Sequence, residues 1–382
     1  MTGQDTNRAV DAVWRLESAR IIAALARLVG HLDLAEDLAQ DALIAALRQW
    51  PESGIPPNPG SWLMAAAKHR AVDRLRRDER LRRNIGRLGH ELRATQETAI
   101  FDGPRDFDAV IEEDFVPDDV LKLMFVACHP VLSAQSRVAL ALRLLGGLTT
   151  DEIARAFLST EPTIAQRIVR AKRTLASRQI PFEVPSARER PARMASVLEV
   201  IYLIFNEGYT ATAGDEWARP ELCREALRLG RMLAELSPAD PEVHGLAALM
   251  EIQSSRMRAR LDPAGQPIPL LEQTRGDWDQ LLIRRGFAAL LRAQDLGRPP
   301  GPYVVQAAIA ACHARARAAE ETDWPGPQRP RALGAHPSRS RVCLPPTAVT
   351  VPVVLGVSDK WLLTRLVLQE TAAQHTLPGD AP

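Results

Sequence analysis

Polar and basic side chains recur on one side of a predicted helix near the middle of the chain. Their spacing of i, i+3, i+4 and i+7 puts them on a single helical face. Amide and guanidinium groups of this kind form hydrogen bonds with base edges in the major groove of DNA, and basic groups beside them hold phosphates. The face consists of Thr163, Gln166, Arg167 and Arg170, and the phosphate-holding cations are Arg170, Lys172 and Arg173.

The residues before this face predict how it is positioned. Thr149 and Glu152 have the spacing of a capping box, which starts a short helix over Asp151–Phe157. A turn follows, and Pro162 stands in the first turn of the second helix, where its missing N–H costs nothing. The second helix has an apolar stripe of Ile164, Ile168, Ala171 and Leu175. This layout is typical of a helix-turn-helix, although an ordinary amphipathic hairpin with a solvated basic face fits the same spacing.

A second basic helix is predicted over Ser61–Arg87. Its apolar residues fall on one face, and a dense group of cations falls on the other, an arrangement that binds polyanions by counterion release. A solvated face is the alternative, because Asp73, Asp78 and Glu79 have the spacing to pair with neighbouring arginines. The apolar residues are Met64, Ala67, Ala71 and Leu75, and the cationic group is His69, Arg70, Arg76, Arg77 and Arg80.

Charge and proline mark the boundaries between segments. Residues 68–93 carry a net charge of +6, whereas residues 95–119 carry −8. So sharp a reversal predicts a domain edge followed by an acidic linker. Four prolines make Pro51–Pro59 a loop, and three more make Ile180–Pro191 a second linker.

Composition excludes several classes of protein. The chain has 382 residues, 46% hydrophobic and 25% charged, with a net charge of +1, which is ordinary for a globular protein. It has no P-loop, GxGxxG, HExxH or GxSxG motif. We therefore expect that the protein is not an enzyme and that it binds no cofactor and no metal. Four scattered cysteines without CxxC spacing predict a reduced, cytoplasmic protein, and the sequence predicts neither a signal peptide nor a membrane span.

The C-terminal half predicts antiparallel helices in a solenoid-like arrangement. These helices cover residues 194–209, 220–236, 241–260, 278–294 and 302–320. From Pro325 onward the pattern changes: nine prolines occur in 58 residues, and no acidic residue lies between Asp323 and Asp359. An out-of-frame reading of a GC-rich gene and a genuine Pro-rich tail both fit this composition.

Several segments together resemble a known family. LAEDLAQDALIAAL (34–47) and SWLMAAAKHRAVDRLRR (61–77) resemble region 2 of extracytoplasmic-function sigma factors of bacterial RNA polymerase. The stretch from Asp118 through EPTIAQRIVRAK resembles region 4. IPF (180–182) and IYLIFNEGYTAT (201–212) look like the subgroup with a C-terminal extension related to tetratricopeptide repeats. The resemblance covers residues 10–324.

The resemblance implies an all-α protein and a role for each matching segment. Region 2 is residues 8–94, the acidic linker 95–117, region 4 118–180, the extension 192–324, and the irregular tail 325–382. Thr163, Gln166, Arg167, Arg170, Lys172 and Arg173 match the helix that reads the −35 element. Lys68, Arg70, Arg74, Arg76 and Arg77 match the helix that contacts the −10 element. Asp33, Glu36, Asp37, Gln40 and Asp41 match the surface that binds the β′ clamp helices of core polymerase.

The implied function is promoter-specific transcription initiation. Its partners are core RNA polymerase, through the β′ clamp helices and the β flap, and promoter DNA, with an unidentified protein or ligand at the extension and no membrane. The alternative is a helix-turn-helix regulator whose C-terminal solenoid acts as a sensor. That alternative uses residues 118–180 and leaves the acidic and basic helices of residues 30–90 unexplained.

Overall fold

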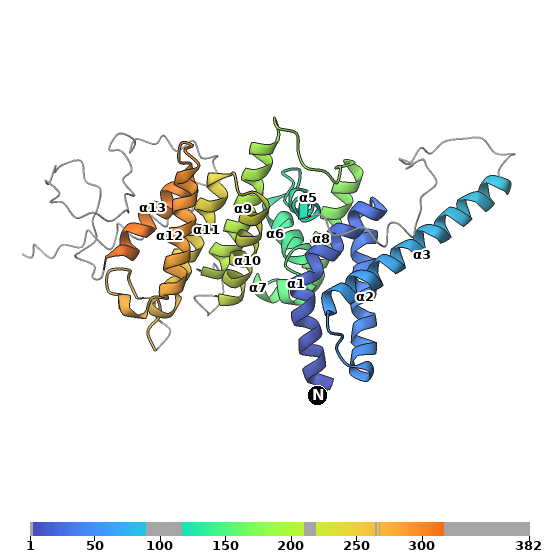
Figure 1. Cartoon of the computed structure of the whole chain (residues 1–382), viewed down its shortest axis with the longest axis horizontal. Helices are drawn as coiled ribbons and strands as arrows, with labels where there is room; N and C mark the ends of the chain where they lie inside the picture. Colours follow the sequence, from blue (N-terminus) through green and yellow to red (C-terminus); the bar gives the residue numbers. More distant parts are fainter. Residues whose placement is uncertain (1–2, 89–116, 210–218, 264–265, 267, 317–382) are drawn as a thin grey trace, which may run out of the picture. The chain divides into compact units, whose positions relative to one another are not determined.

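The structure, a computed structural model, describes residues 3–88, 117–209, 219–263, 266 and 268–316 (Figure 1). The regular elements in these ranges are α-helices and two short 3-10 helices, which confirms the expected all-α class. Helices α1 to α10 form one compact unit and α11 to α13 a second, so each is described by itself.

The first three helices pack against one another and build the N-terminal part of the first unit (Figure 1). They are α1 (Gly3–Val29), α2 (Leu32–Ser53) and α3 (Pro59–Leu88). Gly30 has φ +71, a left-handed conformation that glycine adopts without strain and that lets the chain turn from α1 into α2. Ile21, Leu25, Trp50 and Leu63 are fully buried between the helices.

The loop expected at Pro51–Pro59 is shorter in the structure. Helix α2 continues through Pro51 to Ser53, and the backbone N–H of Gly54 closes it on the carbonyl of Trp50 at 3.0 Å. Buried Trp50 anchors this last turn and rests edge-on against Trp62 of α3, with ring centroids 5.4 Å apart. Proline is tolerated here because only the end of the helix is affected.

The next four helices contain the predicted helix-turn-helix. They are α5 (Pro117–Ala127), α6 (Ala134–Leu144), α7 (Thr150–Ala156) and α8 (Glu161–Ser177). Ser133 caps α6 by accepting a hydrogen bond from the N–H of Ser136 at 3.3 Å. Helix α8 packs on both α6 and α7, around buried Leu140, Ile153 and Ile164.

Two helices of the predicted extension pack in the same unit as α5 and α6. They are α9 (Arg190–Tyr209) and α10 (Pro220–Leu236). Arg137 of α6 pairs with Glu199 of α9 at 2.7 Å, and Arg193 donates to the carbonyl of Phe125 at 2.7 Å. A Cβ on Gly208 would lie 2.6 Å from the backbone nitrogen of Cys223, so only glycine permits this close approach of α9 and α10.

The second unit contains α11 (Pro241–Ser255), α12 (Gln280–Asp295) and α13 (Pro302–Arg315). Glu242 caps α13 by accepting hydrogen bonds from the N–H groups of Tyr303 and Val304, at 2.8 and 3.2 Å. Burial, opposed by these hydrogen bonds, raises the pKa of the Glu242 carboxyl. A Cβ on Gly245 would meet Val304 at 2.6 Å, so α11 and α13 are in close contact.

The helices expected in the C-terminal half are present, with shifted ends. The helix expected over residues 241–260 stops at Ser255 and gives way to a 3-10 turn at Met257–Ala259. The one expected from Trp278 begins at Gln280, because Asp279 caps it. The acidic linker at residues 95–117 lies outside the described residues except for Pro117, and the whole tail, 325–382, lies outside them too. No helix among the described residues is long and apolar enough to cross a membrane.

Candidate nucleic-acid interface

Helices α7 and α8 form the predicted helix-turn-helix. Thr149 accepts from the N–H of Glu152 at 3.1 Å, and the Glu152 carboxylate accepts from the N–H of Thr149 at 2.9 Å, which confirms the capping box. Thr160 caps α8, and Pro162 lies in its first turn as expected. Leu158, in the turn between the helices, has φ +45 and an exposed side chain.

Helix α8 is two-sided as its sequence predicts. Ile164, Ile168, Ala171 and Leu175 are buried. The opposite face, which we call the reading face, comprises Thr163, Gln166, Arg167, Arg170 and Arg173, all exposed except Arg167, which is half-buried. Amide and guanidinium groups on an open helical face can enter the major groove and contact base edges.

Lys172 lies apart from the reading face. Its side chain is only 12% exposed, and its Nζ lies 2.6 Å from Glu36 Oε2 and 2.9 Å from Asp33 Oδ1. Burial alone would lower the pKa of Lys172, but the two carboxylates outweigh it and raise the pKa above the ordinary value. The predicted phosphate contact is therefore an ion pair with helix α2 in this structure.

The predicted polymerase-binding residues lie along α2 and are unequally exposed. Glu36 is 4% exposed and is held by Lys172, by Arg143 Nε at 2.6 Å and by Gln40 Nε2 at 2.8 Å. Asp37 and Asp41 are exposed, and the side chain of Asp33 is 59% exposed. Burial, together with the neighbouring acids, raises the pKa of Asp37 against the opposing charge of Lys172.

The predicted −10 residues on α3 also differ from one another. Lys68 is 8% exposed, on the same side as buried Ala67, Ala71 and Val72. Arg74 pairs with Asp78 at 3.2 Å. Arg70 and Arg77 hydrogen-bond carbonyls of their own helix, and Arg76 is half-buried. Among the described side chains of α3, Arg74 and Arg77 are thus exposed, while Lys68 faces the bundle.

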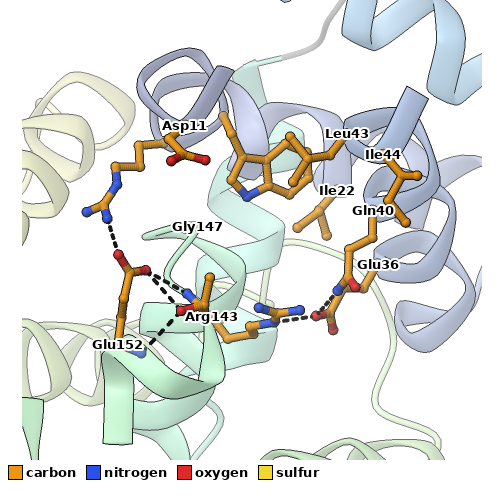
Figure 2. Close-up of a pocket in the computed structure, with 12 residues that line it drawn as sticks. Asp11, Ile22, Glu36, Gln40, Leu43, Ile44, Arg143, Gly147 and Glu152 are labelled. Atoms are coloured by element: carbon orange, nitrogen blue, oxygen red, sulfur yellow. Dashed lines mark hydrogen bonds and ion pairs between the residues drawn. The ribbon is translucent and has the colours of Figure 1, made fainter. Parts of the chain in front are cut away.

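A cavity of about 270 Å³ lies between α1, α2 and the α6–α7 segment (Figure 2). Glu36, Gln40 and Arg143 line one side of it, and Arg15 pairs with Glu152 at another. Trp14, Ile22, Leu43 and Ile44 supply its apolar wall. The cavity is thus part of the contact between the α1–α3 bundle and the helix-turn-helix.

The polar residues at the end of α9, within the segment IFNEGYTAT (204–212), have structural partners where they are described. Glu207 pairs with Arg219, and Tyr209 stacks on Phe205 with ring centroids 5.4 Å apart. Cys128 and Cys223 are buried thiols, and burial raises the pKa of Cys128 to about 12. The part of the chain that the structure describes holds no cluster of three potential metal ligands.

Sequence reasoning missed the residues that join the two halves of this site. Arg143 reaches Glu36, Arg15 reaches Glu152, and Arg27 lies 2.8 Å from the fully buried carboxylate of Asp119. No local pattern marks these residues, because each partner is encoded on a distant helix.

The described helices combine an open helix-turn-helix with an arginine-rich helix. This combination is typical of helical DNA-binding proteins. Comparison with family models is more specific. Residues 14–81 match sigma-70 region 2, residues 122–175 match sigma-70 region 4, and residues 193–294 match a family of unknown function (DUF6596).

Among individual proteins, the uncharacterized protein R00370 of Rhizobium meliloti (strain 1021) is 43% identical over 311 residues, 81% of this chain and 72% of that protein. The chain belongs to the family of that protein, and it carries the region 2 and region 4 domains of sigma-70 proteins. A probable ECF RNA polymerase sigma factor, SigI of Mycobacterium tuberculosis, is 27% identical over 189 residues, 49% of this chain and 61% of SigI. No solved structure matches the chain. The tetratricopeptide-like nature of the extension stays a prediction, since the family matched there has no known function.

Proposed function

We propose that the chain is an extracytoplasmic-function sigma factor that binds core RNA polymerase and directs promoter-specific initiation. The observation that carries the proposal is the presence of sigma-70 region 2 and region 4, in that order, within one compact unit. The similarity to a probable ECF sigma factor supports it. As such a factor, the protein works in the cytoplasm with polymerase and promoter DNA.

The proposed residue roles follow the two regions. Region 4 reads the −35 element with the reading face of α8, and Lys172 joins Arg170 and Arg173 on phosphates once it is free of α2. Region 2 contacts the −10 element through Lys68, Arg70, Arg74, Arg76 and Arg77 of α3. Asp33, Glu36, Asp37, Gln40 and Asp41 bind the basic surface of the β′ clamp helices, and region 4 meets the β flap.

The proposed role of the C-terminal helices is regulation of the sigma regions. Arg137, Arg193 and Arg228 tie α9 and α10 to the region 4 helices, so a protein or ligand bound to this extension has a physical route to region 4. Matching of residues 193–294 to one family model supports treating the extension as a segment with a role of its own.

Run-off transcription tests the proposal. Purified core polymerase, with and without the full chain, is incubated with a library of promoter fragments from a related genome. Specific transcripts are expected only when both components are present. Failure of the chain to co-purify with core polymerase at low salt would contradict the proposal.

A helix-turn-helix regulator remains the second candidate, and the exposure of the reading face favours it. Thr163, Gln166 and Arg170 are open in the free chain, so duplex DNA can reach them without polymerase. Gel-shift titration separates the two candidates. A regulator binds specific duplex alone, whereas a sigma factor binds it specifically within holoenzyme.

A further inference from the structure

Two basic side chains of region 4 hold the most buried acid of the predicted polymerase-binding helix. Glu36 Oε1 accepts from Arg143 Nε, and Glu36 Oε2 contacts Lys172 Nζ, each at 2.6 Å. Asp33 adds a second carboxylate to Lys172 at 2.9 Å. We call these four residues, Asp33, Glu36, Arg143 and Lys172, the latch.

We propose that the latch is an autoinhibitory contact: region 4 covers Glu36 and contacts Asp33 of the polymerase-binding surface of region 2, and core polymerase must displace Arg143 and Lys172 to reach these two acids. This inference rests on the proposed sigma function. In the free chain, the partner of Asp33 and Glu36 is thus the chain's own region 4.

Charge complementarity supports one shared surface rather than two. The acidic helix offers Asp33 and Glu36 to cations, and a clamp surface suited to these acids must itself be basic. Arg143 and Lys172 already supply a guanidinium and an ammonium at those carboxylates. A second basic surface can approach Glu36 only after they leave.

The latch also prevents Lys172 from making its predicted contact with a DNA phosphate. Lys172 cannot neutralise a phosphate while Asp33 and Glu36 hold its ammonium in a nearly buried position. Opening therefore releases an acidic surface for polymerase and a cation for DNA in one step. This coupling lets a free sigma chain remain weak toward DNA until polymerase binds.

Buried and exposed ion pairs at this contact contribute differently. Breaking the Glu36 pairs without a replacement leaves a buried carboxylate uncompensated, which is strongly unfavourable. The Arg15–Glu152 pair, whose arginine side chain is 48% exposed, contributes little because water screens it. Cations of the polymerase replace Arg143 and Lys172 at Glu36, so opening in the presence of polymerase leaves no unpaired carboxylate. Added salt only partly compensates this carboxylate.

Zero-length carbodiimide cross-linking tests the closed form with the native residues of the full chain. The chain has only four lysines, Lys68, Lys122, Lys172 and Lys360, so the products are readily assigned by mass spectrometry. The free chain is expected to give a link from Lys172 to Asp33 or Glu36. Prior addition of excess core polymerase is expected to abolish it. Absence of the link in the free chain, or its persistence in holoenzyme, overturns the proposal.

Arg143→Gln tests the consequence for polymerase binding. Because it removes one cation from Glu36 and leaves the polymerase-binding acids intact, it should raise the population of the open form. We expect a lower cross-link yield and about a three- to tenfold gain in apparent affinity for core polymerase. Arg155→Gln is the matched control, since Arg155 pairs at 3.0 Å with Asp151 of its own helix α7, and both side chains are exposed. Equal affinities of the two variants overturn the proposal.

A folding check keeps the experiment interpretable. Arg143 also donates to the carbonyl of Leu148 at 3.1 Å, so its loss can disturb α6. If circular dichroism shows that Arg143→Gln disturbs the fold, Arg15→Gln is used in its place. We expect it to raise the affinity for core polymerase as well, by a smaller factor. Polymerase that binds no variant at all contradicts the proposed function and the release step together, whereas the link in the free chain reports the latch independently.

Discussion

Helices α2 and α8 carry the two predicted functional faces of the sigma regions, and the protein treats them differently. The reading face of α8 is open, with Thr163, Gln166, Arg170 and Arg173 all exposed. On α2, Glu36 is 4% exposed beneath cations from region 4. Both helices have the period of an amphipathic helix, so periodicity does not explain the difference. What packs against each helix decides whether its polar residues are free to bind a partner.

Residues on the two faces contribute differently to the stability of the folded chain. A polar residue on an open face contributes little to stability and is available for binding. For a carboxylate enclosed by two cations, removal of one partner destabilises the folded state, because it leaves a buried charge uncompensated. Variants along α2 and α8 can therefore be divided into those that change stability and those that change recognition.

The largest expected effect is that of Glu36→Ala. It removes the shared partner of Arg143 and Lys172, so the free energy of unfolding of the first unit should fall by about 3–5 kcal/mol. Urea denaturation followed by circular dichroism measures this change. Asp41→Ala, on the same helix and exposed, is the control and should stay within about 0.5 kcal/mol of the parent. Similar losses in both variants would contradict the distinction between covered and open acids.

Acid titration checks the comparison without changing either face. Burial and nearby arginines lower the pKa of His129 and of His313 to about 4. A histidine in the unfolded chain has a pKa near 6.5. Between pH 6.5 and 4 the unfolded chain therefore binds more protons than the folded chain. This stability is complete above that window and is lost as the pH falls through it, by up to about 3 kcal/mol for buried His313 and less for half-buried His129.

Urea unfolding of the parent, His129→Gln and His313→Gln at several pH values measures the histidine contribution. Each replacement should flatten the pH dependence, His129→Gln in the first unit and His313→Gln in the second. A loss of stability that survives both replacements would instead assign the acid sensitivity to groups other than these two histidines.

The open face is tested by Arg167→Ala in holoenzyme. Loss of a base contact should cost about 1–3 kcal/mol on the cognate −35 element and relax specificity there. Arg173→Ala is the comparison variant, since removal of a phosphate contact should weaken all sequences alike and reduce the salt dependence. Fluorescence anisotropy with cognate and scrambled duplexes measures both. Equal weakening of the two duplexes by Arg167→Ala would contradict its assignment to base reading.

Local sequence signals were sufficient for most of the helix-turn-helix. The capping box at Thr149, Pro162 and the apolar stripe from Ile164 to Leu175 act over a few residues, and the structure confirms each of them. The sequence analysis assigned Lys68 to the −10 contact and did not expect it to be buried. Its spacing was a signal that could have shown this, since Lys68 follows Met64 by four residues and precedes Val72 by four and so shares their helical face.

The latch was not accessible from the sequence. Glu36 and Lys172 are separated by more than a hundred residues. The periodicity of each helix does not predict which distant helix packs against it. The same applies to Arg27 and the buried carboxylate of Asp119. The charge patterns predicted which helical faces bind a partner. Only the tertiary packing shows which residues of the chain itself contact those faces.

The smallest effect concerns Leu158, which belongs to neither face. Its φ of +45 is a left-handed conformation that costs a residue with a Cβ about 1–2 kcal/mol. Leu158→Gly removes that strain but adds freedom to the unfolded chain, so we expect a net stabilisation of about 0.5–1 kcal/mol. Gln179→Gly is the matched control, because Gln179 has φ +50 just after α8 and should gain similarly. Thermal unfolding measures both, and DNA affinity should not change in either. Weaker DNA binding by Leu158→Gly alone would instead extend the open face to the exposed leucine of the turn, because its side chain is 56% exposed beside the start of α8.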